Sequence, residues 1–198
     1  MAAATHEVQH HTSTGIDSRK ILMWIFLASE CLFFGALIST YLIFKGDSIS
    51  GPMPEEILDI PVTSTSTFVL LMSSVTMVLA VFGAQHGRPV LMKAMLLATI
   101  VLGLTFLGFQ VYEFRTFGHE GLNLTTNQFS ATFFVLTGFH GTHVGVGVLY
   151  LGSLLVSSFR RAGLGEERAL HVDIAGLYWH FVDIVWIVIF TIIYLMPH

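Results

Sequence analysis

Five long apolar runs constrain this chain more than any other feature of its sequence. They cover about residues 21–44, 62–85, 92–113, 129–158 and 174–196, and each can cross the roughly 30 Å hydrocarbon core of a bilayer as a helix. Transmembrane strands are disfavoured, because the runs are continuous rather than segments of alternating hydrophobicity. We therefore predict an all-α integral membrane protein, in which a polar tail of residues 1–20 precedes a five-helix transmembrane bundle over residues 21–198.

The composition agrees with a membrane protein. Only 11% of the residues are charged, whereas a soluble domain averages about 25%. The net charge of −4 is small and spread along the chain, so no nucleic-acid partner is expected. Cys31 is the only cysteine, which excludes an internal disulfide and a cysteine-based metal cluster.

Lysine and arginine positions predict the orientation of the bundle. One side of the predicted membrane carries Arg19, Lys20, Arg88, Lys93, Arg160, Arg161 and Arg168, whereas the other carries Lys45 and Arg115. Cytoplasmic loops are enriched in these residues. We therefore expect the N-terminus in the cytoplasm and the C-terminus outside.

The last apolar run contains two ionisable residues at its centre. The stretch LYWHFVDIVW, Leu177 to Trp186, places His180 and Asp183 about one helical turn apart, with Trp179 beside them. A charged Asp at mid-bilayer costs at least about 2.5–3.5 kcal/mol. These side chains are therefore expected to face protein rather than lipid.

Other polar residues fall at neighbouring depths in the predicted helices. Glu30 lies in the first run, and His140 and His143 are i,i+3 neighbours in the fourth. With His180 and Asp183 they form a predicted buried polar core. Gln110 and Glu113 form a second i,i+3 pair, at the outer end of the third run.

Small and hydroxyl-bearing side chains mark two of the runs. The second run is rich in Ser and Thr, including Thr67, Ser73 and Ser74. The fourth contains Gly141 and Gly145 in a G-x-x-x-G spacing, which lets membrane helices approach closely. Packing within the bundle accounts for both patterns.

Three interpretations of the polar core remain open at this point. The side chains can hydrogen-bond across helices and fix the packing. They can form a proton or ion pathway, with a protonated Glu30 as a relay. Paired histidines on two helices can also hold haem, as in membrane cytochromes. Spacing alone does not choose among them.

Several of these motifs resemble one known family. FHGTHVGVGVLYL (Phe139 to Leu151) followed by LYWHFVDIVWIVIFTIIYL is similar to the last two helices of subunit III of haem-copper terminal oxidases. WIFLASECLFF, which carries Glu30, and FQVYEF, which carries Gln110 and Glu113, resemble two further motifs of that family. The resemblance covers about residues 20–196 and is closest to the short five-helix bacterial form. Asp173 departs from the Glu that many members have there.

The resemblance implies a multi-pass subunit of the bacterial plasma membrane that has no catalytic centre or metal of its own. Haem and copper would belong to subunits I and II. This chain would pack mainly on subunit I, with subunit II and a small subunit IV as further candidate partners. It would also bind structural phospholipid and support proton uptake and sustained dioxygen reduction.

The resemblance also assigns roles to individual residues. The polar core would be Glu30, His140, His143, His180 and Asp183, with Gln110, Glu113 and Asp173 as secondary polar residues. The candidate lipid or interface contacts would be Trp24, Trp179, Trp186, Tyr178, Gly141 and Gly145.

Glu30 is typical of cytochrome c oxidases, so we expect cytochrome c as the electron donor of the complex. A ubiquinol oxidase subunit and a nitric oxide reductase accessory subunit are the alternatives within the family. A membrane dihaem cytochrome is the alternative from another class. A proton-coupled transporter is disfavoured, because the sequence shows no inverted repeat.

Overall fold

A computed structural model describes residues 15–45, 60–119, 121–122, 124–160 and 166–196. In these residues it contains five helices that are long and apolar enough to cross a membrane, which confirms the predicted all-α fold. The helices are α1 (Ser18–Phe44), α3 (Ile60–Gln85), α4 (Pro89–His119), α5 (Gln128–Arg160) and α6 (Glu166–Phe190), and α6 continues into a π-helical turn, η1 (Thr191–Leu195). Most of the predicted N-terminal tail lies outside the described residues.

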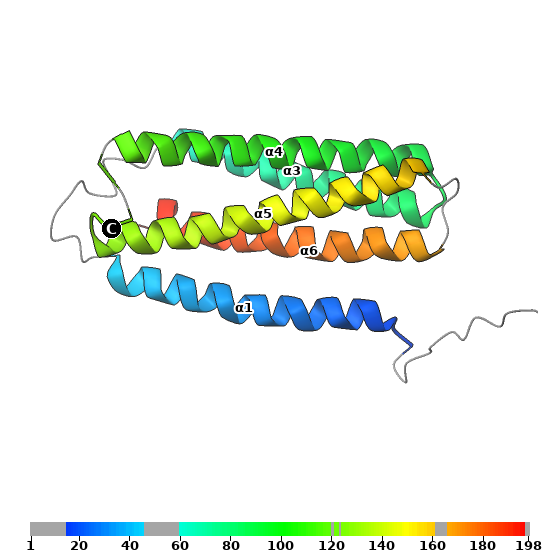
Figure 1. Cartoon of the computed structure of the whole chain (residues 1–198), viewed down its shortest axis with the longest axis horizontal. Coiled ribbons are helices and arrows are strands. Elements are labelled where there is room, and N and C mark those ends of the chain that lie inside the picture. The colour runs from blue at the N-terminus through cyan, green and yellow to red at the C-terminus, as the bar shows by residue number, and fades with distance from the viewer. Residues whose placement is uncertain (1–14, 46–59, 120, 123, 161–165, 197–198) are drawn as a thin grey trace, which may run out of the picture.

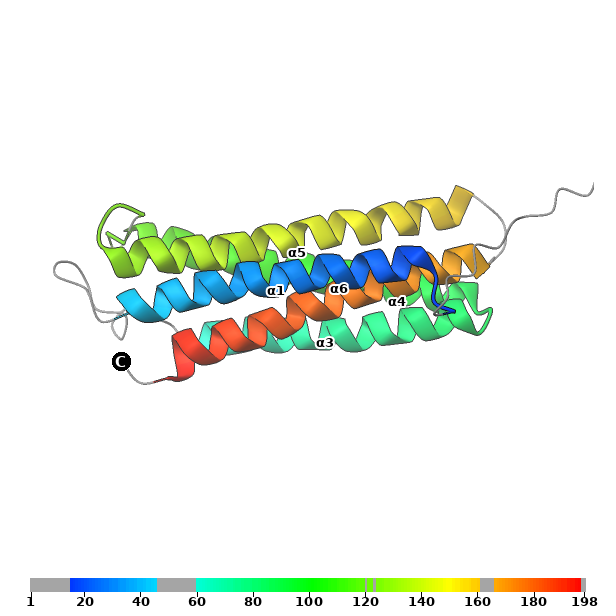
Figure 2. The ribbon, with the colours of Figure 1, turned by 90° about the horizontal axis from the view of Figure 1, so that it is seen from below.

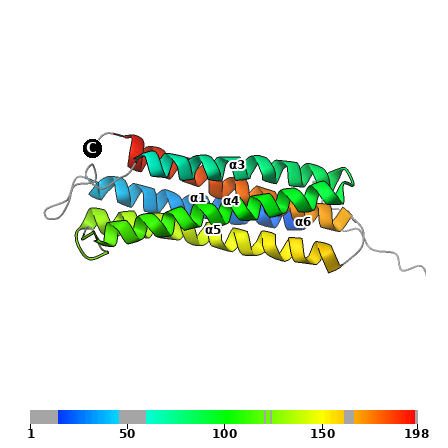
Figure 3. The ribbon, with the colours of Figure 1, turned by 90° about the horizontal axis from the view of Figure 1, so that it is seen from above.

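Successive helices run in opposite directions along one elongated bundle (Figure 1). α3 packs against α4 and α6, and α5 packs against α4 and α6. α1 lies on one side of the bundle, where it contacts α5 and α6 (Figure 2). Viewed from the opposite side, α3 and α4 lie in front of α1 (Figure 3). The start of α1 and the end of η1 therefore lie at opposite ends of the bundle.

Local sequence signals define several helix ends. Asp17 caps α1 by accepting a hydrogen bond from the backbone N–H of Arg19 at 2.8 Å. The turn between α3 and α4 is tight, and Gly87 adopts φ 65° within it. A Cβ on Gly83 would lie 2.8 Å from the backbone nitrogen of Met92, so only glycine allows this approach. Pro89 then begins α4, where its missing N–H costs no helical hydrogen bond.

Two helices extend beyond the apolar runs that predicted them. α4 continues to His119 rather than ending near residue 113, and α6 begins at Glu166 rather than near residue 174. Hydropathy marks the part of a helix that suits hydrocarbon, whereas polar residues continue the same backbone hydrogen bonding beyond it. The additional turns carry polar residues such as Arg115 and Glu167.

One large aromatic side chain fills the centre of the bundle. The indole of Trp179 on α6 is only 2% exposed and lies where Gly103 of α4 and Gly147 of α5 lack side chains. A Cβ on Gly103 or Gly147 would lie 2.7 or 2.9 Å, respectively, from a ring carbon of Trp179. These two glycines let three helices converge on one tryptophan, which places the polar residues of α6 against α3.

Candidate functional site

Hydroxyl groups of α3 bind the polar side chains of α6. The indole N–H of Trp179 donates to Oγ of Ser73 at 3.0 Å, and that of Trp186 donates to Oγ1 of Thr67 at 3.0 Å. Oγ of Ser74 lies 2.7 Å from Nδ1 of His180. The LYWHFVDIVW stretch thus faces the hydroxyl-rich run of α3. The sequence showed those hydroxyls but not their partners.

Ser74 also contacts the two ionisable residues of α6. Its hydroxyl hydrogen-bonds the imidazole of His180 and also lies close to the carboxyl of Asp183. Oδ1 of Asp183 is buried and has no hydrogen-bond partner within the described part of the chain. His180 and Asp183 therefore both lie beside a serine of another helix.

A second polar pair joins α1 to α5. Oε2 of Glu30 lies 3.2 Å from Nε2 of His143, and the two side chains are only 16% and 18% exposed. Nδ1 of His143 lies 2.7 Å from the carbonyl oxygen of Phe139 and must donate to it. Nε2 can then either accept the proton of a carboxylic acid or donate to a carboxylate. Either arrangement would leave the pair without net charge.

His140 is separate from both groups. Its ring is fully buried, stacks on Trp186 at a centroid distance of 4.8 Å, and meets the edge of Phe106 at 5.8 Å. Neither ring nitrogen has a hydrogen-bond partner among the described residues. The i,i+3 spacing with His143 placed both residues near one face of α5, but their neighbours differ.

The secondary polar residues lie near the two ends of the bundle. Nε2 of Gln110 donates to the carbonyl oxygen of Thr137 at 2.6 Å, and Glu113 accepts a hydrogen bond from Thr63. Near the opposite end, the ammonium of Lys20 on α1 lies 2.6 Å from Oδ2 of Asp173 on α6. This ion pair attaches the start of α1 to the bundle.

The candidate lipid or interface residues divide into two groups. Trp24 is 55% exposed on α1 and remains available for such contacts. The expectation was wrong for Trp179 and Trp186, each of which is only 2% exposed, because their N–H groups bind hydroxyls inside the bundle. The hydroxyl of Tyr178 donates to the carbonyl oxygen of His143 at 2.9 Å.

The two glycines of the G-x-x-x-G spacing also differ. Gly141 lies directly against the side chain of Gln110, where a Cβ would overlap the amide. No such neighbour lies within 4 Å of the Cβ position at Gly145. The spacing therefore contributes one close contact rather than a helix–helix seam.

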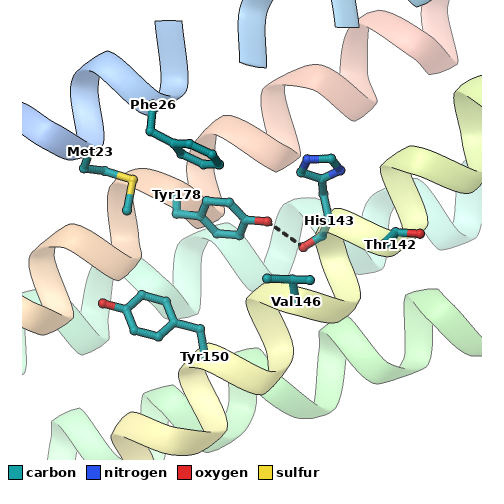
Figure 4. Close-up of a pocket in the computed structure, with 7 residues that line it drawn as sticks. All are labelled: Met23, Phe26, Thr142, His143, Val146, Tyr150 and Tyr178. Atoms are coloured by element: carbon teal, nitrogen blue, oxygen red, sulfur yellow. Dashed lines mark hydrogen bonds between the residues drawn. The ribbon is translucent and has the colours of Figure 1, made fainter. Parts of the chain in front are cut away.

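A groove of about 280 Å³ opens between α1 and α5 beside the Glu30–His143 pair. Its lining comes from α1, α5 and α6 and consists of Met23, Phe26, Thr142, His143, Val146, Tyr150 and Tyr178 (Figure 4). We call it the α1–α5 groove. The lining is mainly apolar, so this groove suits a hydrocarbon chain better than a polar molecule.

Comparison with known proteins decides the family. The chain matches the family model described as cytochrome c oxidase subunit III over residues 1–197. The chain belongs to this family. It is 38% identical to a probable quinol oxidase subunit 3 of Staphylococcus saprophyticus over 94% of this chain and 96% of that protein. It is 40% identical to a cytochrome c oxidase subunit 3 of Bacillus sp. (strain PS3) over 87% of this chain and 83% of that protein.

Membership of the subunit III family defines the general role of the chain. It is a subunit III of a haem-copper terminal oxidase and a non-catalytic subunit of an oxidoreductase complex. Its five candidate membrane spans and its bacterial relatives make it a multi-pass plasma membrane protein. In complexes of this family the haem and copper sit in other subunits.

The family match decides against the dihaem alternative, and the membrane histidines differ in which of their ring nitrogens are occupied. Nδ1 of His143 contacts the carbonyl oxygen of Phe139, and its Nε2 contacts the carboxyl of Glu30. Trp186 covers one face of the His140 ring. Nδ1 of His180 binds Ser74. Within the described ranges, no group of three or more His, Cys, Asp or Glu side chains could hold a metal ion.

Proposed function

We propose that this chain packs on the catalytic subunit I of its oxidase and holds phospholipid in the α1–α5 groove. Through both contacts it supports proton uptake and sustained dioxygen reduction. Subunit II and a small subunit IV are further proposed partners. In this arrangement the chain binds no haem or copper itself. The observation that carries the proposal is the mainly apolar groove beside the closely paired side chains of Glu30 and His143.

The position of the groove along α1 supports lipid as its occupant. Met23 and Phe26 lie three and six residues beyond Lys20, or roughly 5 and 9 Å deeper along the helix. With the proposed cytoplasmic N-terminus, the groove lies just below the headgroups of the inner leaflet. Trp24 is exposed at the same level, where interfacial tryptophans are common. An acyl chain in the groove would help to hold α1 against α5.

The Glu30–His143 pair supports a role for this chain beside a proton pathway. It does not suggest a redox site within the chain. The two atoms lie 3.2 Å apart, and one proton between them would leave the pair without net charge. Such a pair is tolerated in a bilayer interior, where an isolated charge is costly. We propose that it fixes the wall of the α1–α5 groove and keeps a polar group close to the partner subunit.

We expect cytochrome c as the electron donor of the complex, with ubiquinol as the alternative. Relatives of both names match the chain at similar identity. Oxidation of reduced cytochrome c and of ubiquinol by the purified complex would distinguish the two donors.

The lipid proposal can be tested by filling the groove. Val146 lines it and is 53% exposed, so Val146→Trp places an indole in the opening without disturbing buried packing. Leu149→Trp, at an exposed position of the same helix that is not among the groove residues, is the matched control. We expect the Val146 variant to lose tightly bound phospholipid in native mass spectrometry and to inactivate earlier during turnover. Unchanged lipid content and turnover lifetime would contradict the proposal.

A further inference from the structure

A second groove, of about 260 Å³, lies between α3 and α6. Its lining includes Val78, Phe82 and Gln85 from α3 and Asp173, Leu177 and His180 from α6. We call it the α3–α6 groove. Unlike the α1–α5 groove, it brings an imidazole, a carboxylate and an amide to a surface between two membrane-spanning helices.

Only one of the two ring nitrogens of His180 has a hydrogen-bond partner among the described residues. Its Nδ1 binds Ser74 inside the bundle at 2.7 Å. Nε2 has no hydrogen-bond partner among the described residues, and the side chain lines the groove. His180 lies six residues after the start of the last apolar run near residue 174, and seven residues after Asp173, whose partner Lys20 lies at the headgroup level, so it is roughly 9–10 Å inside the hydrocarbon. An unpaired polar atom at this depth is unfavourable, because hydrocarbon offers no hydrogen bond.

Apolar side chains surround that nitrogen. Val78 and Phe82 line the groove and are exposed, and Leu71 and Val75 continue the outward face of α3. Ile184, one turn beyond His180, is exposed on α6. An apolar stripe with one polar group at its centre is typical of membrane helix interfaces, where a polar side chain hydrogen-bonds across the contact.

The depth of His180 distinguishes between possible occupants. Lipid headgroups lie about 15 Å from the middle of a hydrocarbon core that is 30 Å thick. A headgroup therefore does not reach His180, and an acyl chain has no hydrogen-bonding group to offer. A helix that spans the membrane can present a polar side chain at this depth.

We propose that the α3–α6 groove binds a transmembrane helix of another subunit of the oxidase. That helix carries a hydroxyl, amide or carboxyl group that hydrogen-bonds Nε2 of His180. The proposal rests on the proposed packing of this chain in the oxidase complex, and it assigns the surface and the anchoring residue.

Photocrosslinking within the intact complex tests the occupant. Benzoylphenylalanine at Val78, 54% exposed in the groove, is compared with the same residue at Val101, 52% exposed on α4. We expect Val78 to crosslink to another oxidase subunit and Val101 to do so much less. Crosslinks from Val78 only to lipid, or to a second copy of this chain, in a complex that still contains its haem-bearing subunit would overturn this inference alone. Failure of the chain to purify with any haem-bearing subunit would overturn the proposed function as well.

A substitution at His180 tests the anchoring hydrogen bond. His180→Asn keeps an N–H group near the position of Nδ1, where it can bind Ser74, and removes Nε2. We expect the ratio of bound to free chain in detergent to fall about tenfold, as for the loss of one buried hydrogen bond. Thermal unfolding of the separated chain should stay unchanged. Retention equal to that of the unmodified chain would refute the role of Nε2.

Discussion

Removing the acid of Glu30 tests how the pair between α1 and α5 is held. The carboxyl lies 3.2 Å from Nε2 of His143, whose Nδ1 is occupied by the carbonyl oxygen of Phe139. In Glu30→Gln the amide N–H can donate to Nε2, so the contact survives without a charged form. Hydrogen bonds to charged groups contribute about 1.5–3 kcal/mol and neutral ones about 0.5–1.5 kcal/mol. We expect a loss of about 1 kcal/mol and nearly intact assembly.

Glu30→Leu should cost more, because it leaves Nε2 of His143 without a partner at a site only 18% exposed. An unsatisfied buried acceptor costs about 1–3 kcal/mol. The assay is release of the chain from the purified oxidase as detergent concentration or temperature rises. Cys31→Ser, at an exposed neighbouring position, is the matched control. If Glu30→Gln releases the chain as readily as Glu30→Leu, a charged carboxylate is required and our reasoning is wrong.

Two further substitution pairs test the packing. Gly147→Ala places a methyl group 2.9 Å from a ring carbon of Trp179 and should lower stability by about 1–3 kcal/mol, whereas Gly145→Ala meets no neighbour and should be neutral or slightly stabilising. Equal shifts of the two melting temperatures in detergent would contradict the glycine-lined site. Ser74→Ala removes the hydroxyl that binds the imidazole of His180 and lies beside the carboxyl of Asp183, and it should cost about 1–3 kcal/mol. Ser66→Ala, whose hydroxyl binds only its own helix, should cost much less, and similar unfolding by both serine variants would refute the inter-helix role of Ser74.

The membrane fold could be predicted from the sequence because it depends on continuous hydropathy. A run of about 20 apolar residues is long enough to cross a bilayer as a helix, and a helix satisfies its backbone hydrogen bonds without water. Helix ends were harder to predict, since polar turns extend α4 and α6 without a change in backbone hydrogen bonding. Gly87 provides the positive φ of the turn after α3, and Pro89 begins α4, three residues before the predicted start near residue 92.

The polar residues of the candidate site could be identified from the sequence, but the contacts between them could not. Helical spacing places His140 and His143 near one face, yet one ring stacks on Trp186 and the other meets Glu30. Which residue each side chain meets depends on helix rotation and crossing, and a single sequence does not specify either. Similarly, the family resemblance implied lipid or interface contacts for the tryptophans of α6. Glycines on α4 and α5, distant in sequence, provide the space that buries Trp179.

The role of the chain is tested by gentle purification from its native membrane, and its orientation is tested by protease digestion of sealed membranes before solubilisation. The partners are identified by mass spectrometry, and optical spectra are recorded for the complex and for the separated chain. The account predicts a large haem-bearing subunit in the complex and no haem band from the chain alone, with the N-terminus accessible to protease only from the cytoplasmic side. A chain that purifies alone with haem in fixed ratio would contradict it, and His140, His143 and His180 would then be the ligands to examine.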